Sequence, residues 1–308
     1  MLRRAVLLWV FALVGVLLTY RLAEQGLGLE RQDSLATDTR ATTQSGCSGR
    51  NGLGIDNEWS LQACTFRSKE SRLGPLLVLG DSTAASLSDG VILAGEELGF
   101  SVVVFPSRGC PFATRQPYSY TWCGSFFDDS LELATDLKPR AIIISNYLSR
   151  MDIDDRRIPF PDGDLPRKKD ERLQSAVQSV HDALLRLQNA LPTTPILYVH
   201  EIPTIPFAQR PTLLRRVSEL SIRRDSLSFR RQSSYITAVE SKSESYPNIT
   251  FLNPSSLLCG IVSCSAVTTG GINLYMDSYH LNPEGSEVLA EPIKSFLRKS
   301  VLNGSETE

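Results

Sequence analysis

The chain has 308 residues, of which 42% are hydrophobic and 21% are charged. This is an ordinary globular composition, and it excludes a chain that is disordered throughout. The 32 Lys and Arg residues nearly balance the 34 Asp and Glu residues. The resulting net charge of −2 gives no general attraction to nucleic acid, so no nucleic-acid partner is expected.

The N-terminus carries a long apolar run. Residues 5–20 read AVLLWVFALVGVLLTY, with arginines on both sides. They would make about 24 Å of helix, short of the roughly 30 Å hydrocarbon core, but flanking arginines can snorkel and Trp9 and Tyr20 suit the interface. We predict an uncleaved single-pass transmembrane helix, with the N-terminus in the cytoplasm and the rest of the chain exported. A cleaved signal peptide, for which the cleavage-site match is poor, and a buried core helix are the alternatives.

Six cysteines form an even set in a chain with a predicted export signal, which indicates disulfides. The sequence leaves the pairing open, and sequential pairing is the most economical because each bond closes a short loop. It predicts Cys47–Cys64, Cys110–Cys123 and Cys259–Cys264. No C-x-x-C motif occurs and there are only three histidines, so neither a metal site nor another cofactor is predicted.

Short apolar runs alternate with longer amphipathic stretches from residue 75 onward. The runs are continuous and rich in Val, Ile and Leu, which is typical of buried parallel strands. The predicted strands are 75–79, 101–105, 141–144, 195–199 and 249–252. The predicted helices are 84–98, 126–137, 168–191, about 213–242, and 283–297, the last with Asn282 as N-cap and Pro283 at the first helical position. Five strand–helix repeats predict a three-layer α/β/α domain with a five-stranded parallel sheet.

These patterns divide the chain into five parts. The predicted parts are a transmembrane anchor (1–22), a tether (23–45), a Cys-bounded lead-in (46–73), a catalytic domain (74–300) and a flexible tail (301–308).

Two motifs fall where ligands bind in such sheets, at the carboxyl ends of the strands. Residues 80–83, GDST, follow the first strand and place Ser82 at a helix N-terminus. Asp277 and His280 precede the last helix, and their spacing lets the carboxylate orient the imidazole, the base that a serine nucleophile needs. Ser82 as a helix cap and His280 as a surface residue beside a turn are the alternatives. Because the topology brings both motifs to one sheet edge, the sequence favours a Ser82–His280–Asp277 triad.

GDS after the first strand and D-x-x-H before the last helix resemble the SGNH (GDSL-type) hydrolase superfamily, which has a flavodoxin-like fold. The resemblance covers roughly residues 74–298. Three stretches are more similar to the periplasmic SGNH domains that are fused to, or partnered with, membrane acyltransferase-3 proteins. They are residues 108–112 (RGCPF), residues 258–264 with two cysteines, and residues 274–285 (LYMDSYHLNPEG).

The resemblance implies Ser82 as nucleophile, His280 as base and Asp277 as its orienting partner. It also implies an oxyanion hole made by Ser82, Gly109 and Asn146. Two departures stand out: Thr83 replaces the usual Leu or His, and Ser145-Asn146-Tyr147 replaces Gly-x-Asn-Asp. Gly109 and Asn146 as plain turn residues remain alternatives.

The resemblance further implies an O-acetyltransferase of a cell-envelope polysaccharide that works through an acyl-Ser82 intermediate. It would sit at the bacterial cytoplasmic membrane, with its catalytic domain periplasmic or extracellular. The acceptor would be the polysaccharide, and the donor a separate membrane acyltransferase protein. An SGNH carbohydrate esterase and a catalytically inactive, anchored glycan-binding module are the alternatives.

Two further features are weighed here. Residues 210–231 hold seven arginines against two acidic residues. A solvated helix face is the plain interpretation, and a surface for anionic lipid or anionic glycan is the alternative. His200 follows the fourth predicted strand, and we expect it in a loop or buried position rather than in the site.

Overall fold

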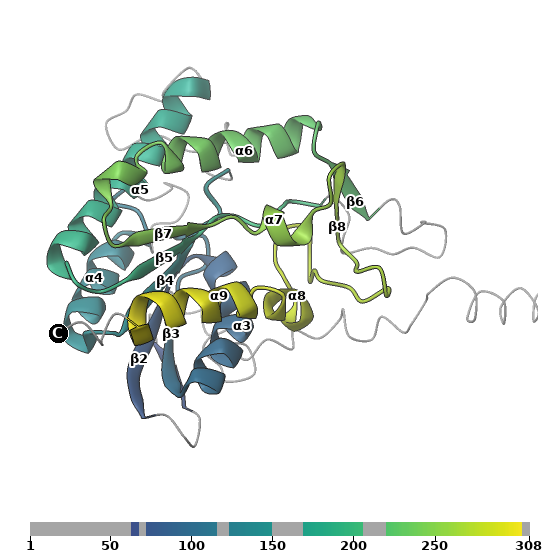
Figure 1. Cartoon of the computed structure of the whole chain (residues 1–308). Helices are drawn as coiled ribbons and strands as arrows, with labels where there is room; N and C mark the ends of the chain where they lie inside the picture. The colour runs from purple at the N-terminus through teal and green to yellow at the C-terminus, as the bar shows by residue number, and fades with distance from the viewer. Residues whose placement is uncertain (1–62, 68–71, 116–122, 150–168, 206–219, 304–308) are drawn as a thin grey trace, which may run out of the picture.

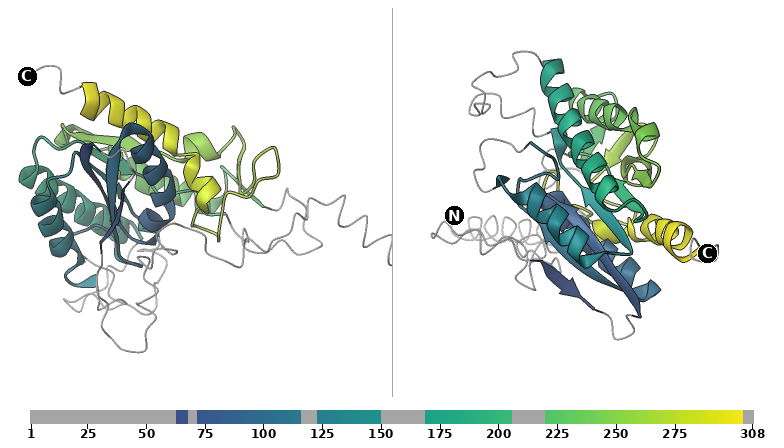
Figure 2. Two further views of the ribbon diagram at one scale, coloured as in Figure 1. Left: turned by 90° about the horizontal axis from the view of Figure 1, so that it is seen from below. Right: turned by 90° about the vertical axis from the view of Figure 1, so that its left-hand side faces the viewer.

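The computed structural model describes residues 63–67, 72–115, 123–149, 169–205 and 220–303. They form an α/β domain in which a six-stranded sheet lies between two layers of helices (Figures 1 and 2). The strand order is β1-β3-β2-β4-β5-β7.

All five predicted strands are present. They are β2 (Leu73–Gly80), β3 (Phe100–Pro106), β4 (Ala141–Ser145), β5 (Ile196–Val199) and β7 (Ile249–Leu252), and they pair in parallel. The prediction of a purely parallel, five-stranded sheet is wrong, because β1 (Cys64–Phe66) pairs antiparallel with β3. This strand is too short to show a period, and it covers an edge that β3 would otherwise expose.

Alternate residues of β2 enter two cores. Leu76 and Val78 face α3 (Ser82–Leu98) and α9 (Ala290–Leu297), while Leu77 and Leu79 face the helices on the other side. Those helices are α4 (Phe126–Leu137), α5 (Lys169–Ala190) and α6 (Leu227–Glu240). All four β2 side chains are fully buried, which explains the unbroken apolar runs. Burial of this kind contributes about 25 cal/mol per Å² of apolar surface.

Two predicted helices are divided. Of the predicted helix 213–242, the described part holds β6 (Ser221–Arg223) and α6, whose N-cap Ser226 accepts a hydrogen bond from the Phe229 N–H. β6 pairs with β8 (Ser263–Ser265) in a small second sheet, a long-range contact that amphipathic periodicity does not reveal. The predicted helix 283–297 is two helices, α8 (Pro283–Glu287) and α9. Asn282 caps α8 as expected, accepting from the Gly285 N–H at 2.8 Å.

Short elements complete the chain. They are α7 (Ser255–Leu258), a 3₁₀ turn (Ser243–Ser245) and a π-helical turn (Arg298–Leu302).

The predicted anchor, the tether and Cys47 lie outside the described residues. Within the ranges that are described, no helix has the length and apolar character needed to cross a membrane.

Candidate active site

Ser82 lies at the point where the sheet topology reverses. The chain leaves β2 for β3 on one side and later returns to β4 on the other, so the carboxyl end of β2 lies between two loops. Gly80 has φ +135°, and a Cβ there would lie 1.9 Å from the Ser145 carbonyl oxygen. Glycine at this position therefore lets the turn before Ser82 pass against β4.

Asp81 fixes the turn that presents Ser82. Its Oδ1 caps α3 by accepting from the Thr83 N–H at 2.8 Å and from the Thr83 hydroxyl at 2.7 Å. Its Oδ2 accepts from the Tyr147 N–H at 2.8 Å, which joins the turn to the loop after β4. Burial raises the pKa of Asp81, although these hydrogen bonds act in the opposite direction.

Ser82, His280 and Asp277 form one hydrogen-bonded series. His280 Nε2 lies 2.7 Å from Ser82 Oγ, and His280 Nδ1 lies 2.6 Å from Asp277 Oδ2. Asp277 Oδ1 also accepts from the backbone N–H groups of Tyr279 and His280. Burial raises the pKa of Asp277, but the hydrogen bond and the charge of His280 lower it more, so its pKa lies below the usual value. The carboxylate is therefore charged at neutral pH and can stabilise an imidazolium.

Close backbone packing brings His280 to a residue 198 positions away. α8 begins three residues after His280 and packs on α3. The Gly90 N–H of α3 donates to Ser286 Oγ at 2.7 Å, and a Cβ on Gly90 would lie 2.2 Å from the Ser286 carbonyl oxygen. A Cβ on Gly285 would likewise lie 2.0 Å from the Leu274 carbonyl oxygen. Two glycines thus permit the approach that aligns imidazole with hydroxyl.

Gly109 occupies a turn at the end of β3. Its φ of +75° favours glycine, and the Cys110 N–H closes the turn on the Ser107 carbonyl at 3.0 Å. This loop and Asn146 both lie at the carboxyl ends of strands that flank β2.

The Asn146 side chain has partners other than those predicted. Its Oδ1 accepts from the Phe112 N–H at 2.7 Å, and its Nδ2 donates to the Phe112 carbonyl at 3.3 Å and the Tyr198 hydroxyl at 3.5 Å. The residue is only 1% exposed. This side-chain amide clamps the loop after β3, so in this structure its hydrogens are already used.

Sequence reasoning missed three residues at this edge. Tyr147 and Tyr279 stack with ring centroids 5.2 Å apart, and the Tyr279 ring lies 4.4 Å from that of His280. Glu201 accepts from the Ser149 N–H at 3.1 Å and the Ser149 hydroxyl at 2.8 Å. Tyr147 and Glu201 each follow a strand end by two residues, so the same positional rule that selected Ser82 would have found them.

His200 is buried, as expected. It is 3% exposed, and its Nε2 lies 3.0 Å from Glu240 Oε1.

Two predicted disulfides, Cys110–Cys123 and Cys259–Cys264, are present. Cys64 is also disulfide-bonded, and its predicted partner Cys47 lies outside the described part of the chain. Among the described residues, no group of three or more His, Cys, Asp or Glu is placed to hold a metal ion.

The fold and this site define an α/β domain with a serine, a histidine and an aspartate in series at a topological switch point. The sequence model of the family described as "SGNH domain (fused to AT3 domains)" matches residues 46–295, and the chain belongs to that family.

Solved structures share the fold. The periplasmic domain of a lipopolysaccharide acetyltransferase from Salmonella ser. Paratyphi A matches with a TM-score of 0.50 and 14% identity, over 77% of this chain and 85% of that one. The lipase Lip_vut3 from a goat rumen metagenome matches with a TM-score of 0.43 and 12% identity, over 74% and 97% of the two chains. The acetyl xylan esterase Est2A from Butyrivibrio proteoclasticus matches with a TM-score of 0.40 and 15% identity, over 76% and 65%. No curated protein matches the sequence.

Proposed function

We propose that this protein is an extracytoplasmic serine acyl-transfer enzyme. The observation that carries the proposal is the hydrogen-bonded series from Asp277 through His280 to Ser82, with both heavy-atom distances below 2.8 Å. A serine hydroxyl is a weak nucleophile until a base can take its proton, and this geometry places that base.

The proposed reaction has two halves. Ser82 Oγ attacks the ester carbonyl carbon while His280 Nε2 takes the hydroxyl proton. The ester C–O bond then breaks, His280 returns the proton to the leaving alcohol, and an acyl-Ser82 ester remains. An acceptor hydroxyl, deprotonated by His280, attacks that ester and restores Ser82. The backbone N–H groups of Ser82 and Gly109 are the proposed oxyanion donors, each typically worth a few kcal/mol.

The acceptor we propose is a hydroxyl of a cell-envelope polysaccharide, which makes the protein an O-acetyltransferase. Two findings support this choice: the family is described as fused to AT3 domains, and the Salmonella relative is the periplasmic domain of a lipopolysaccharide acetyltransferase. A separate membrane acyltransferase would supply the acetyl group. The apolar run at residues 5–20 would hold the domain at the outer face of the bacterial cytoplasmic membrane.

The test is acetylation of the full-length protein in detergent by an activated acetyl ester, followed by intact mass within seconds and again after minutes. We expect one acetyl group on the wild type and none on Ser82→Ala, whose ester turnover should fall by about 10⁴-fold or more. Ser278→Ala is the matched control, because Ser278 lies between Asp277 and His280 in sequence, and it should still be acetylated.

The lifetime of the adduct separates transferase from esterase. An acetyl-Ser82 that persists in water but is consumed by added polysaccharide supports transfer, whereas rapid loss to water indicates a carbohydrate esterase. A wild type that forms no adduct and consumes no ester contradicts both, and leaves an inactive glycan-binding module.

A further inference from the structure

The large hydrophobic side chains that the described residues expose all lie in one part of the chain, around β6 and β8. We call this set the apolar tip. It consists of Leu227, Leu257, Ile261, Val262 and Ile272. Ile261 is 94% exposed and Val262 is 66% exposed, the values expected of charged loop residues rather than of branched aliphatic ones. In Figure 1, β6, β8 and α7 lie together at one end of the molecule.

The centre of the apolar tip is a rigid turn. Ile261 and Val262 are its two middle residues, where the Gly260 N–H donates to the Ser263 carbonyl at 2.9 Å and the Cys259–Cys264 disulfide closes the base. Tight turns of this kind normally carry Gly, Asn or Asp at the middle positions. Cys264 is fully buried and belongs to the same core cluster as Ile222 and Leu258. The domain therefore holds two aliphatic side chains out in water on a firmly packed support.

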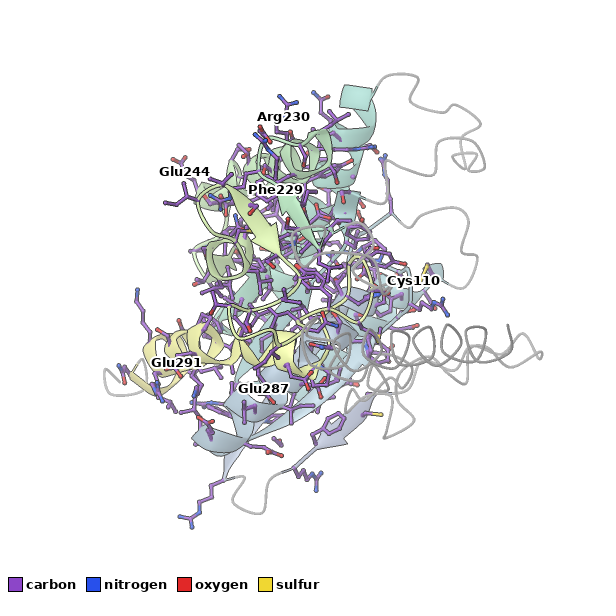
Figure 3. The ribbon with its side chains drawn as sticks, turned by 90° about the vertical axis from the view of Figure 1, so that its right-hand side faces the viewer. Cys110, Phe229, Arg230, Glu244, Glu287 and Glu291 are labelled. Atoms are coloured by element: carbon purple, nitrogen blue, oxygen red, sulfur yellow. A yellow bond between two sulfur atoms is a disulfide. The ribbon has the colours of Figure 1, made fainter. Side chains whose placement is uncertain are left out.

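A basic border lies beside this turn. The Arg224 N–H of the loop after β6 donates to the Val262 carbonyl at 2.9 Å, so the two segments are adjacent. Residues 220–231 contain four arginines against one acidic residue, Asp225. Arg230 is exposed at the start of α6, and Figure 3 shows it beside Phe229. Exposed aliphatic side chains with a basic border are the chemistry of a surface that enters an anionic membrane interface.

We propose that the apolar tip inserts into the headgroup region of a bilayer that contains anionic lipid, with the β6 and α6 arginines on the phosphates. The charge of the border favours this occupant, because a neutral apolar groove on a protein would not require four arginines around it. The predicted anchor at residues 5–20 would keep the domain beside such a bilayer. This proposal does not rest on acyl-transfer chemistry.

Insertion would fix the active site relative to the membrane. β8 continues into residues 266–274, where the Leu274 N–H donates to the Ala266 carbonyl at 2.8 Å, and Asp277 follows three residues later. The tip and the Asp277–His280 segment are therefore parts of one connected structure, and docking the first sets the height of the second.

The test uses the full-length protein with Val262→Trp, in a background where Trp9, Trp59 and Trp122 are replaced by Phe. The protein is reconstituted into vesicles of phosphatidylethanolamine and phosphatidylglycerol that carry lipids brominated near the headgroup end of their acyl chains. We expect blue-shifted, quenched emission, because the ring should lie about 5–10 Å below the phosphates. Arg230→Gln should lower the inserted fraction about fivefold at low salt, and vesicles of phosphatidylcholine alone should quench less.

A tryptophan at Asp136 on α4, at the end of the molecule opposite β6 and β8 in Figure 1, is the matched control and should stay unquenched. Ile261→Trp carries the same test if Val262→Trp fails to fold. Three results would overturn the proposal. One is emission from Val262→Trp that matches the Asp136→Trp control. Another is equal quenching with and without anionic lipid. The third is a blue shift produced by an anionic polysaccharide and not by vesicles.

Discussion

Two histidine–carboxylate pairs lie in this domain, and they differ in what surrounds them. In one, His280 Nδ1 lies 2.6 Å from Asp277; in the other, His200 Nε2 lies 3.0 Å from Glu240. Both imidazoles are buried. The second nitrogen of His280 reaches a hydroxyl on Ser82, whereas His200 stacks on Phe251 with ring centroids 5.5 Å apart.

The difference shows that contact with an acid does not by itself make a histidine a base. Burial lowers the pKa of His200 to about 4, so it is neutral at pH 7 and its hydrogen bond to the half-exposed Glu240 serves packing. Asp277, by contrast, accepts two backbone N–H bonds besides His280, and its pKa is lowered. A fixed charge on one side and a hydroxyl on the other are what suit His280 to move a proton.

The largest expected effect comes from removing each imidazole in turn. His280→Ala should reduce kcat/KM for an acetyl ester by about 10⁴-fold or more, while the free energy of unfolding changes by about 1 kcal/mol. His200→Ala should do the reverse: it leaves a cavity beside Phe251, costs about 2–4 kcal/mol of stability, and keeps activity per folded molecule within about threefold. Ester turnover and urea unfolding measure the two. A collapse of stability in His280→Ala would make it a structural histidine.

Changing the two carboxylates sharpens the same contrast. Asp277→Asn preserves an acceptor for the backbone N–H groups but removes the charge that stabilises the imidazolium, so kcat should fall by about 10³–10⁴-fold. Glu240→Gln should change kcat by less than about twofold. Steady-state kinetics on both variants decide the matter, and equal losses would mean that the two pairs share one role.

The sequence predicted the parts of the fold that repeat locally. Five strands and the cap at Asn282 follow from apolar runs and helix-start chemistry, which depend on neighbouring residues. Strands β1 and β6 have three residues each and exist only because they pair with β3 and β8, distant in sequence. No periodicity can develop over three residues, so both were missed.

The site shows the same limit. The spacing of Asp277 and His280 predicted their contact, because three residues across a turn leave little choice. The direction of the Asn146 amide depends instead on Phe112 and Tyr198, which local sequence does not place beside it. Glu201 escaped notice because a single acidic residue after a strand carries no motif.

Glu201 and His200 oppose each other in the pH dependence of stability. Burial raises the pKa of Glu201 from 4.5 to about 8, so between these values the unfolded chain has released a proton that the folded chain retains, and stability falls as pH rises. His200, with its pKa lowered from 6.5 to about 4, makes stability rise with pH between those values. Above pH 6.5 Glu201 acts alone, and unfolding free energy should fall by about 1.4 kcal/mol per pH unit up to about pH 8.

Glu201→Gln should remove that decline, and urea unfolding at pH 6.5 and pH 8 measures it. His200→Gln is the control, since it should leave the decline above pH 6.5 intact. An unchanged slope in Glu201→Gln would assign the pH dependence to other groups.

The smallest expected effect concerns Asn146. As a clamp on the Phe112 loop, its loss in Asn146→Ala should cost about 1–3 kcal/mol of unfolding free energy, because the buried Phe112 N–H is left without its 2.7 Å acceptor. Activity per folded molecule should fall by less than about tenfold. Gly109→Ala is the comparison: a side chain at φ +75° displaces the N–H proposed as an oxyanion donor and should cost about 10²-fold in kcat. If Asn146→Ala loses as much in kcat as Gly109→Ala while keeping its stability, the amide must turn toward the substrate during the reaction, and the clamp gives way to the oxyanion role.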